Sequence, residues 1–282
     1  MGMTDMNLGN LLPSWLRRRR PKISVLRLSG VIGGGGPLRG GALTLDGLNK
    51  SIERAFAPRG LSAVALAINS PGGSPVQSAL IARRIRQIAD KKDIKVIAFA
   101  EDVAASGGYW LACAADEIFA EESSILGSVG VISAGFGFND LLSRYGVERR
   151  VHTAGARKAM LDPFQAENAD DVTRLKSIQT DIHENFKDHV RARRGDRLTG
   201  AEEDIFNGDI FLGKEALALG LIDGIGDLQT TLRERYGDKL RLNPIGQRRS
   251  LLRRRLGVET RDLAGDLIAA VEDWSHWKRF GL

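Results

Sequence analysis

A serine at a glycine-rich turn is the residue of this chain most suited to chemistry. Ser106 follows two small residues, Ala104 and Ala105, and precedes Gly107, Gly108 and an apolar segment. This pattern is typical of a tight turn that feeds a helix starting at the serine. Such a turn leaves the hydroxyl exposed and directs the Gly107 amide toward a developing oxyanion. A glycine-rich turn with a serine helix cap is the simpler alternative.

A serine hydroxyl is a poor nucleophile until a base removes its proton. A lysine can act as that base when its amine is neutral, which requires its removal from water. Lys158 has an unusually apolar neighbourhood for a lysine, with alanines and the pair Met160 and Leu161 close by. An ordinary surface lysine in a loop is the alternative.

Histidine is the more usual base, and His152 is the best placed of the four histidines because it ends an expected strand close to Lys158. The other three lie on a long polar-faced helix or in a basic tail (His183, His189 and His276). A triad of Ser106, His152 and Asp162 can therefore be written, although no spacing demands it. Both bases stay open.

Acyl transfer also needs hydrogen-bond donors for the oxyanion. The amides of Gly73 and Gly107 are candidates, because glycine allows close approach of the backbone. Ser128, within the segment 126–130, is placed to orient the lysine by a hydrogen bond. A serine in an ordinary turn is again the alternative.

Strand-like and helix-like segments alternate along the chain around these residues. Apolar runs predict strands and amphipathic spacing predicts helices. The expected strands are 23–32, 61–68, 94–100, 117–120, 129–132 and 147–152, and the expected helices are 42–56, 75–89, 106–115, 139–145 and 170–194. This alternation argues for an α/β core with a parallel sheet. Since sites gather at the carboxyl ends of parallel strands, we expect the loops 71–73 and 106–108 to face one another.

Four motifs in order identify a family. They are Asn69-Ser70-Pro71-Gly72-Gly73, Ala105-Ser106-Gly107-Gly108-Tyr109, Gly127-Ser128-Val129-Gly130-Val131, and Lys158-Ala159 with Asp162-Pro163-Phe164. Together they resemble the signal peptide peptidase A family of serine peptidases. The resemblance extends through 212–216 and 220–223 and covers roughly residues 23–235.

The resemblance implies an α/β fold of the ClpP/crotonase type, a spiral of repeated β-β-α units with a long C-terminal helical segment. It also implies a Ser–Lys dyad in which Ser106 is the nucleophile and Lys158 the general base. Gly73 and Gly107 become the oxyanion donors and Ser128 a supporting residue. The length resembles that of the short members, whose active sites form where protomers meet in a homo-oligomeric ring.

These observations predict a serine endopeptidase that cleaves apolar or unfolded peptides, including signal-peptide remnants, without a metal or cofactor. Apolar residues near the motifs are expected to line the substrate site (Tyr109, Trp110, Leu126, Ile132 and Phe164). Acyl-CoA chemistry on the same fold is a weaker alternative, because Glu101 and Asp102 are the only acids close to the glycines. A catalytically silent, membrane-associated scaffold is the alternative outside enzymes.

Composition limits the remaining possibilities. The chain has 282 residues, a net charge of +6 and a single cysteine, Cys113, so a disulfide framework or a thiolate metal cage is excluded. We interpret Cys113 as a small buried hydrophobe. No apolar run is long enough to span a bilayer and no secretory pattern is present, so we expect a cytoplasmic setting.

The positive charge is concentrated at the two ends. We therefore divide the chain into a flexible basic segment at 1–22, a peptidase domain at 23–245 and a basic, tryptophan-containing tail at 246–282. Basic residues interleaved with Leu and Trp suit peripheral contact with the surface of an anionic membrane. A solvated tail is the simpler alternative, and nucleic acid is the least favoured partner.

Overall fold

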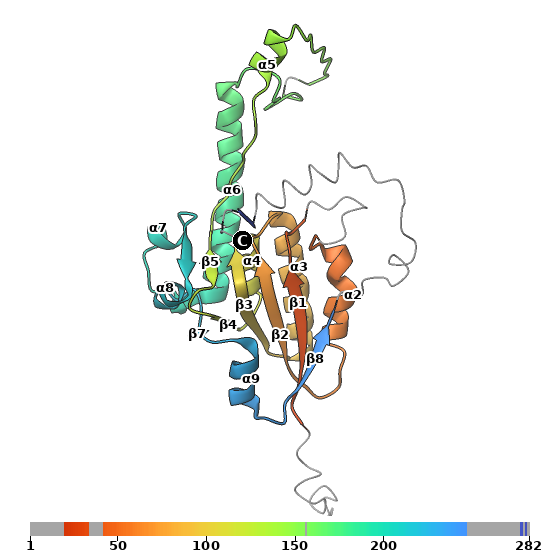
Figure 1. Cartoon of the computed structure of the whole chain (residues 1–282), viewed down its shortest axis with the longest axis vertical. Coiled ribbons are helices and arrows are strands. Elements are labelled where there is room, and N and C mark those ends of the chain that lie inside the picture. The colour runs from red at the N-terminus through yellow and green to blue at the C-terminus, as the bar shows by residue number, and fades with distance from the viewer. Residues whose placement is uncertain (1–19, 34–41, 156, 247–276, 279, 281–282) are drawn as a thin grey trace, which may run out of the picture.

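A single β-sheet forms the centre of the structure (Figure 1). The computed structural model describes residues 20–33, 42–155, 157–246, 277–278 and 280. Within these residues the sheet has eight strands: β1 (Lys22–Ser29), β2 (Leu61–Ser70), β3 (Val96–Ala105), β4 (Glu117–Ala120), β5 (Ile125–Gly127), β6 (Ile210–Leu212), β7 (Gly224–Ile225) and β8 (Arg241–Ile245). Their order is β6-β5-β3-β2-β1-β8, and β4 pairs with both β3 and β7. Every pair is parallel except β5 with β6.

The central strands are buried on both faces, as their continuous apolar sequences predict. Successive residues of β2, such as Val64 and Ala65, are completely buried although they point to opposite faces of the sheet. A strand of this kind needs a layer of helices on each side.

Helices supply both layers. On one face α2 (Leu45–Ala55), α3 (Pro75–Lys92) and α4 (Gly107–Ala112) pack over the sheet and bury Leu66 and Ile68 among other residues. On the opposite face α9 (Leu228–Tyr236) places Leu232 against Ala65 and Phe99. The side chain of Ser74 caps α3 by accepting a hydrogen bond from the Gln77 amide, and Pro75 follows at the first helical position.

A long projection leaves this body. The arm, residues 131–168, connects β5 to α6 (Ala169–Arg194) and contains the short helix α5 (Asn139–Arg144). None of its described residues is buried. Figure 1 shows α5 beyond the N-terminal end of α6, far from the sheet, while the C-terminal half of α6 lies beside the body. Only that half has buried residues (Phe186, Val190 and Arg194).

The α/β prediction is confirmed, and so are the central strands and the long helix near 170–194. The strands expected at 129–132 and 147–152 are wrong, since neither range is a strand. Both lie where the chain leaves the sheet, so no neighbouring strand is present to pair with their backbone.

The remaining short elements are η2 (Gly195–Arg197), α7 (Glu202–Ile205) and α8 (Gly213–Ala218). Most of the tails at 1–22 and 246–282 falls outside the described residues.

Candidate active site

Ser106 occupies a strained turn between β3 and α4. Its φ of 52° and ψ of −121° are unusual for a residue with a side chain. The main chain holds this conformation at both ends: the Ser106 amide donates to Gly127 O at 2.8 Å, and the Ser106 carbonyl accepts from the Trp110 amide at 3.0 Å. The Ser106 side chain makes no capping hydrogen bond, so the simpler interpretation as a helix cap does not apply. The hydroxyl is therefore available as a nucleophile, in the kind of turn that carries the nucleophile of α/β-hydrolases.

The two glycine-rich loops lie against each other, which confirms the sequence prediction. A Cβ on Gly72 would lie 2.8 Å from Ser106 Cβ and 2.9 Å from the Gly107 nitrogen. A Cβ on Gly108 would lie 2.4 Å from the carbonyl oxygen of Ser70. Real Cβ atoms do not come this close, so these positions need glycine for the loops to meet. The contact brings the end of β2 up to the first turn of α4.

Among the amides of these loops, those of Gly73 and Gly107 have no hydrogen bond within the described part of the chain. Gly73 forms a bridge with Ile32, in which the neighbouring residues make the hydrogen bonds: Ile32 N to Gly72 O at 2.8 Å and Ser74 N to Ile32 O at 2.7 Å. Gly107 is the first residue of α4, where an amide has no partner within the helix. Both N–H groups are therefore available as donors to a bound group.

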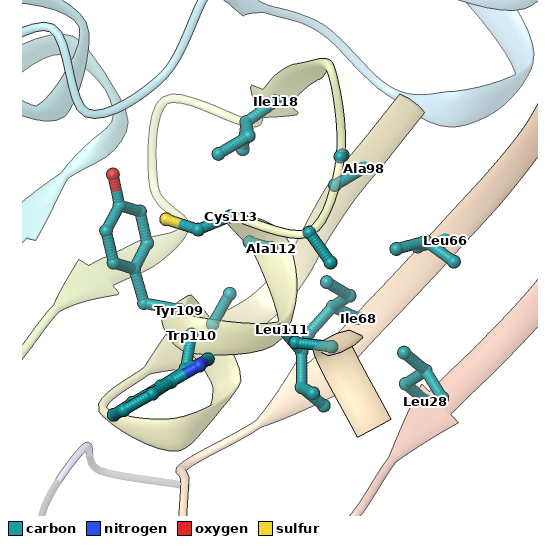
Figure 2. Packing of buried hydrophobic residues seen from close by; sticks show 14 of the residues in the cluster. Leu28, Leu66, Ile68, Ala98, Tyr109, Trp110, Leu111, Ala112, Cys113 and Ile118 are labelled. Atoms are coloured by element: carbon teal, nitrogen blue, oxygen red, sulfur yellow. The ribbon is translucent and has the colours of Figure 1, made fainter. Parts of the chain in front are cut away.

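Helix α4 is fixed deep in the core behind Ser106. Tyr109 is completely buried, and its hydroxyl donates to Leu221 O at 2.7 Å. Figure 2 shows Tyr109 beside Cys113 in this packing. Burial raises the pKa of the Cys113 thiol to about 12, which confirms its interpretation as a buried hydrophobe. Tyr109 is thus a packing residue in this chain, and we do not expect it to contact substrate.

The other residues expected to line a substrate site fall into two groups. Trp110 and Leu126 are buried in the core, and Trp110 stacks on Phe186 with ring centroids 4.7 Å apart. Ile132 and Phe164 lie in the arm and are 69% and 38% exposed. Of the five, only the two arm residues present much apolar surface to a ligand.

Lys158 lies in the outer part of the arm. It is exposed, and its amide donates to Gly155 O at 3.1 Å. The surrounding segment is held together by local contacts: the Phe138 amide donates to Pro163 O at 2.6 Å, and the Phe138 and Phe164 rings lie 5.6 Å apart. The arm that contains it projects from the body (Figure 1), and within the described residues Lys158 makes no hydrogen bond to Ser106. The apolar surroundings expected for this lysine are not formed by one chain alone.

The histidine alternative is not assembled either. His152 is also an exposed residue of the arm. Asp162 forms an ion pair with Arg149 instead of a contact with His152. The hydrogen bond from Arg149 lowers the pKa of Asp162, which keeps this carboxylate charged.

Ser128 lies at the base of the arm and is almost buried, with 6% exposure. It is a second strained serine, with a φ of 50°. Its amide donates to Asp209 O at 2.6 Å, and its carbonyl accepts from Gly130 N at 2.9 Å. Ser128 directly follows Gly127, the residue that accepts from the Ser106 amide, and within the described residues it makes no hydrogen bond to Lys158.

The sequence analysis did not single out Asn69, whose side chain links two strands next to the nucleophile. The Asn69 side chain donates to Asp102 Oδ2 at 2.6 Å and accepts from the Val103 amide at 3.3 Å. It thereby ties the end of β2 to β3, three residues before Ser106. The signal was present, because Asn69 opens the first of the four motifs, but the pairing of β2 with β3 was needed to see its role.

A buried ion pair lies on the far side of α4. Arg194 is 2% exposed and bonds both Asp223 oxygens, at 2.7 and 3.1 Å. It also donates twice to Gly220 O, at 2.9 and 2.8 Å. Burial opposes the charged form of Asp223, but the hydrogen bonds from Arg194 and the Ile118 amide outweigh it and lower the pKa. This pair holds the segment that contains Leu221, the acceptor for Tyr109.

Comparison with known proteins gives consistent relatives. Residues 88–239, more than half of the chain, match the model of Peptidase family S49. The serine protease SPPA, chloroplastic, of Arabidopsis thaliana is 33% identical over 76% of this chain and 32% of its own length. A Brucella abortus protein named Na(+)/H(+) antiporter NhaA is 48% identical over 98% of this chain and 39% of its own length. The chain thus spans about a third of the length of these two relatives.

Solved structures agree on the fold. A lysine-to-alanine variant of the 1510-N membrane-bound stomatin-specific protease, in complex with a substrate peptide, matches with a TM-score of 0.53 at 16% identity. The match covers 90% of this chain and 99% of that one. The chain belongs to Peptidase family S49.

None of the helices that the structure describes combines the length and the apolar character that a bilayer crossing requires.

Proposed function

We propose that the chain is a serine endopeptidase in which Ser106 is the nucleophile, Lys158 the general base, and Gly73 and Gly107 the oxyanion donors. The observation that carries the proposal is the strained turn at Ser106, with an uncommitted hydroxyl and the unbonded Gly107 amide beside it. Membership of Peptidase family S49 supports it.

The chemistry proceeds in two halves. Ser106 Oγ attacks the scissile carbonyl carbon while the neutral amine of Lys158 takes the hydroxyl proton. The Gly73 and Gly107 amides stabilise the oxyanion, and Lys158 returns the proton to the leaving amine. Water then attacks the acyl-enzyme and gives a proton to Lys158, and that proton returns to Ser106 Oγ as the acid product leaves. Ser128 supports the lysine in this scheme by orienting its amine.

We propose further that the lysine comes from a second copy of the chain in a homo-oligomeric ring. Lys158 is exposed and belongs to an arm that projects from the body, and a lysine base needs to be removed from water. The arm around it presents many large apolar side chains to solvent (Ile132, Phe136, Phe138, Leu141, Tyr145, Val147, Val151, Leu161 and Phe164). Contiguous exposed apolar surface of this kind marks an interaction site. Docking of the arm on a neighbour would bury it and desolvate Lys158.

The substrates we propose are apolar or unfolded peptides, including signal-peptide remnants. Ile132 and Phe164 of the arm offer apolar contact surface for them, while Trp110 and Leu126 shape the core behind the site. A substrate peptide bound to the 1510-N protease supports the same class of ligand. No metal or cofactor takes part in the proposed reaction.

The two acids that the acyl-CoA alternative would need are both engaged in other contacts. Glu101 forms an ion pair with Arg27 at 2.8 Å, and Asp102 accepts from Asn69 at 2.6 Å. Both carboxylates are thus engaged in bracing the strands. A silent scaffold has no use for the strain at Ser106, because strain of this kind costs on the order of 1–3 kcal/mol.

We place the chain in the cytoplasm, with peripheral contact to an anionic membrane surface. Arg20, Lys22 and Arg59 line one hollow at the end of the sheet where β1 and β2 begin. Arg20 and Lys22 are the last basic residues of the segment 1–22, and basic side chains of this kind attract anionic lipid headgroups. Nucleic acid is the less favoured partner. Cosedimentation with vesicles of anionic and of neutral phospholipid tests the contact, and equal recovery with both would contradict it.

Complementation between two inactive variants tests the dyad and its assembly. Ser106→Ala and Lys158→Ala should each lower turnover of an unfolded protein substrate by about three orders of magnitude or more. Co-expressed in equal amounts, they should recover roughly a quarter of wild-type activity, because a site between two chains then has a one-in-four chance of receiving both intact residues. A recovery of zero from a mixed oligomer would show that both residues come from one chain. An active Lys158→Ala variant would exclude lysine as the base and make His152 the next candidate.

A further inference from the structure

Two histidines of α6 contact the main chain on either side of the nucleophile. His189 Nε2 lies 3.1 Å from the carbonyl oxygen of Trp110 in α4, and His183 Nε2 lies 2.9 Å from the carbonyl oxygen of Val129. A carbonyl oxygen can only accept a hydrogen bond, so both Nε2 atoms carry a proton and donate it. Neither histidine has a part in the proposed proton transfers.

Each acceptor belongs to a segment that is hydrogen-bonded to Ser106. The Trp110 amide donates to Ser106 O at 3.0 Å, which makes Trp110 the end of the first turn of α4. The Ser106 amide donates to Gly127 O at 2.8 Å, two residues before Val129. The two histidines therefore hold, from a single helix, the segments that fix the nucleophile from its two sides.

The Trp110 carbonyl needs a partner from outside its helix. Helix α4 ends early, because the Ala114 amide donates to Leu111 O instead of continuing the α-helical pattern to Trp110 O. Within the described residues no main-chain amide bonds Trp110 O, and a buried carbonyl without a partner is costly. His189 fills this position, so the bond has a structural cause and is more than a chance contact.

Ring stacking sets the position of α6 at this point. The Trp110 ring stacks on Phe186, with centroids 4.7 Å apart, and on His189, with centroids 5.0 Å apart. His183, Phe186 and His189 occupy about one third of the circumference of α6 and span about 9 Å along it. Burial lowers the pKa of His189 to about 4, with a smaller effect of Arg193 and an opposing one from the Trp110 hydrogen bond, so the ring is neutral at neutral pH.

We infer that His183 and His189 are positioning residues of the active site, which hold Ser106 in its attacking geometry by donating hydrogen bonds to the Val129 and Trp110 carbonyls. The inference rests on the proposed function, since it concerns the same nucleophile. It concerns geometry and not substrate binding, so the effect belongs in kcat. A shift of about 1 Å in a reacting group can cost on the order of a hundredfold in rate.

The test compares kcat and KM of the full chain with those of His183→Ala, His189→Ala, His183→Gln and His189→Gln, using a fluorogenic apolar peptide. Asn185→Ala, an exposed position on the same helix, is the matched control. We expect each alanine variant to lower kcat by about tenfold with KM changed by less than about twofold. Glutamine should recover kcat to within about threefold of wild type, because its amide N–H can donate to the same oxygen. The thermal midpoint and oligomer mass are recorded for every variant.

The outcomes separate this inference from the proposed function. Alanine variants with the kcat of Asn185→Ala, beside an active wild type, would overturn the inference alone. Glutamine variants as impaired as the alanine variants would assign the loss to ring packing and overturn the role of the hydrogen bonds. A wild-type chain that turns over no peptide, under conditions where Ser106→Ala is equally inactive, would overturn the proposed function and this inference with it.

Discussion

Replacement of Gly108 by alanine should damage the active site although it improves a helix. Gly108 is the second residue of α4, and its missing Cβ makes room for the Ser70 carbonyl at the end of β2. Alanine would place a Cβ 2.4 Å from that oxygen, so the two loops must separate by at least 0.6 Å to reach 3.0 Å, the lower limit for real Cβ contacts. The clashing atom is a backbone oxygen, so no flexible side chain can move to relieve the clash.

Helix propensity and the clash have opposite effects on stability. Alanine favours a helix interior over glycine by about 1 kcal/mol. Overpacking in a well-packed core costs about 1–3 kcal/mol. The free energy of unfolding of Gly108→Ala should therefore fall by about 0–2 kcal/mol, which is a small change. The rate is more sensitive, because α4 carries Ser106 at its start, and we expect kcat to fall by at least about tenfold.

The assay measures peptide turnover and urea denaturation in parallel. Gly246→Ala is the control, since a Cβ there meets nothing within 4 Å. A Gly108→Ala variant with the kcat of wild type and a higher free energy of unfolding would refute the reasoning. That result would mean that helix propensity dominates and that the contact between the loops does not position the nucleophile.

Two further predictions concern stability. Arg194→Met should lower the free energy of unfolding by about 1–3 kcal/mol in urea, because Gly220 O loses its two buried donors and the half-buried Asp223 keeps Arg197 and the Ile118 amide as partners. Arg84→Met, which breaks an exposed pair with Glu53, should cost less than about 1 kcal/mol. Equal losses would contradict the argument. The second prediction concerns His189, whose pKa is lowered by burial from the ordinary value of 6.5 to about 4 in the folded chain. The unfolded chain, in which the ordinary value applies, therefore binds this proton more readily. Its contribution to stability is therefore present above pH 6.5 and is lost as the pH falls toward 4, by up to about 3 kcal/mol. The His189→Gln variant should lack this part of the acid dependence. Urea denaturation of both proteins at several pH values measures the difference.

Most of the body could be predicted from the sequence, because its elements depend on local patterns. The run 61–68 is apolar at nearly every position, and β2 is buried on both faces. The glycines at 72–73 and 107–108 predicted two loops at strand ends, and the loops meet because a parallel sheet brings those ends to one edge. Ser106 could be singled out for the same reason.

The arm could not be predicted in this way. The apolar segments 129–132 and 147–152 have strand-like composition, but a strand forms only where a neighbour satisfies its backbone. Nothing local shows that the chain leaves the sheet after β5. The same limit applies to Lys158: an apolar sequence neighbourhood predicts burial when the chain folds back on itself, and here the neighbourhood is displayed to solvent.

The roles of His183 and His189 were missed because a helical sequence shows only polar and apolar faces. Both histidines were interpreted as surface residues of a polar-faced helix. The His189 contact depends on α4, 79 residues earlier, and on the early end of that short helix, which leaves one carbonyl to be bonded. The His183 contact depends on the segment that follows β5, 54 residues earlier. A carbonyl in one helix that needs a hydrogen-bond donor from another helix can be recognised only when the tertiary packing is known.

Separation of the nucleophile from its proposed base gives the fold a means of control. Ser106 is preorganised by backbone bonds within one chain, while Lys158 is exposed and can act as a base only after its amine is removed from water. Desolvation must then come from whatever covers the outer part of the arm. Since the surface to be covered is apolar, the same contact that drives association would complete the site. A chain not yet assembled would hold a poised nucleophile without a base, and its proteolytic activity would depend on its concentration.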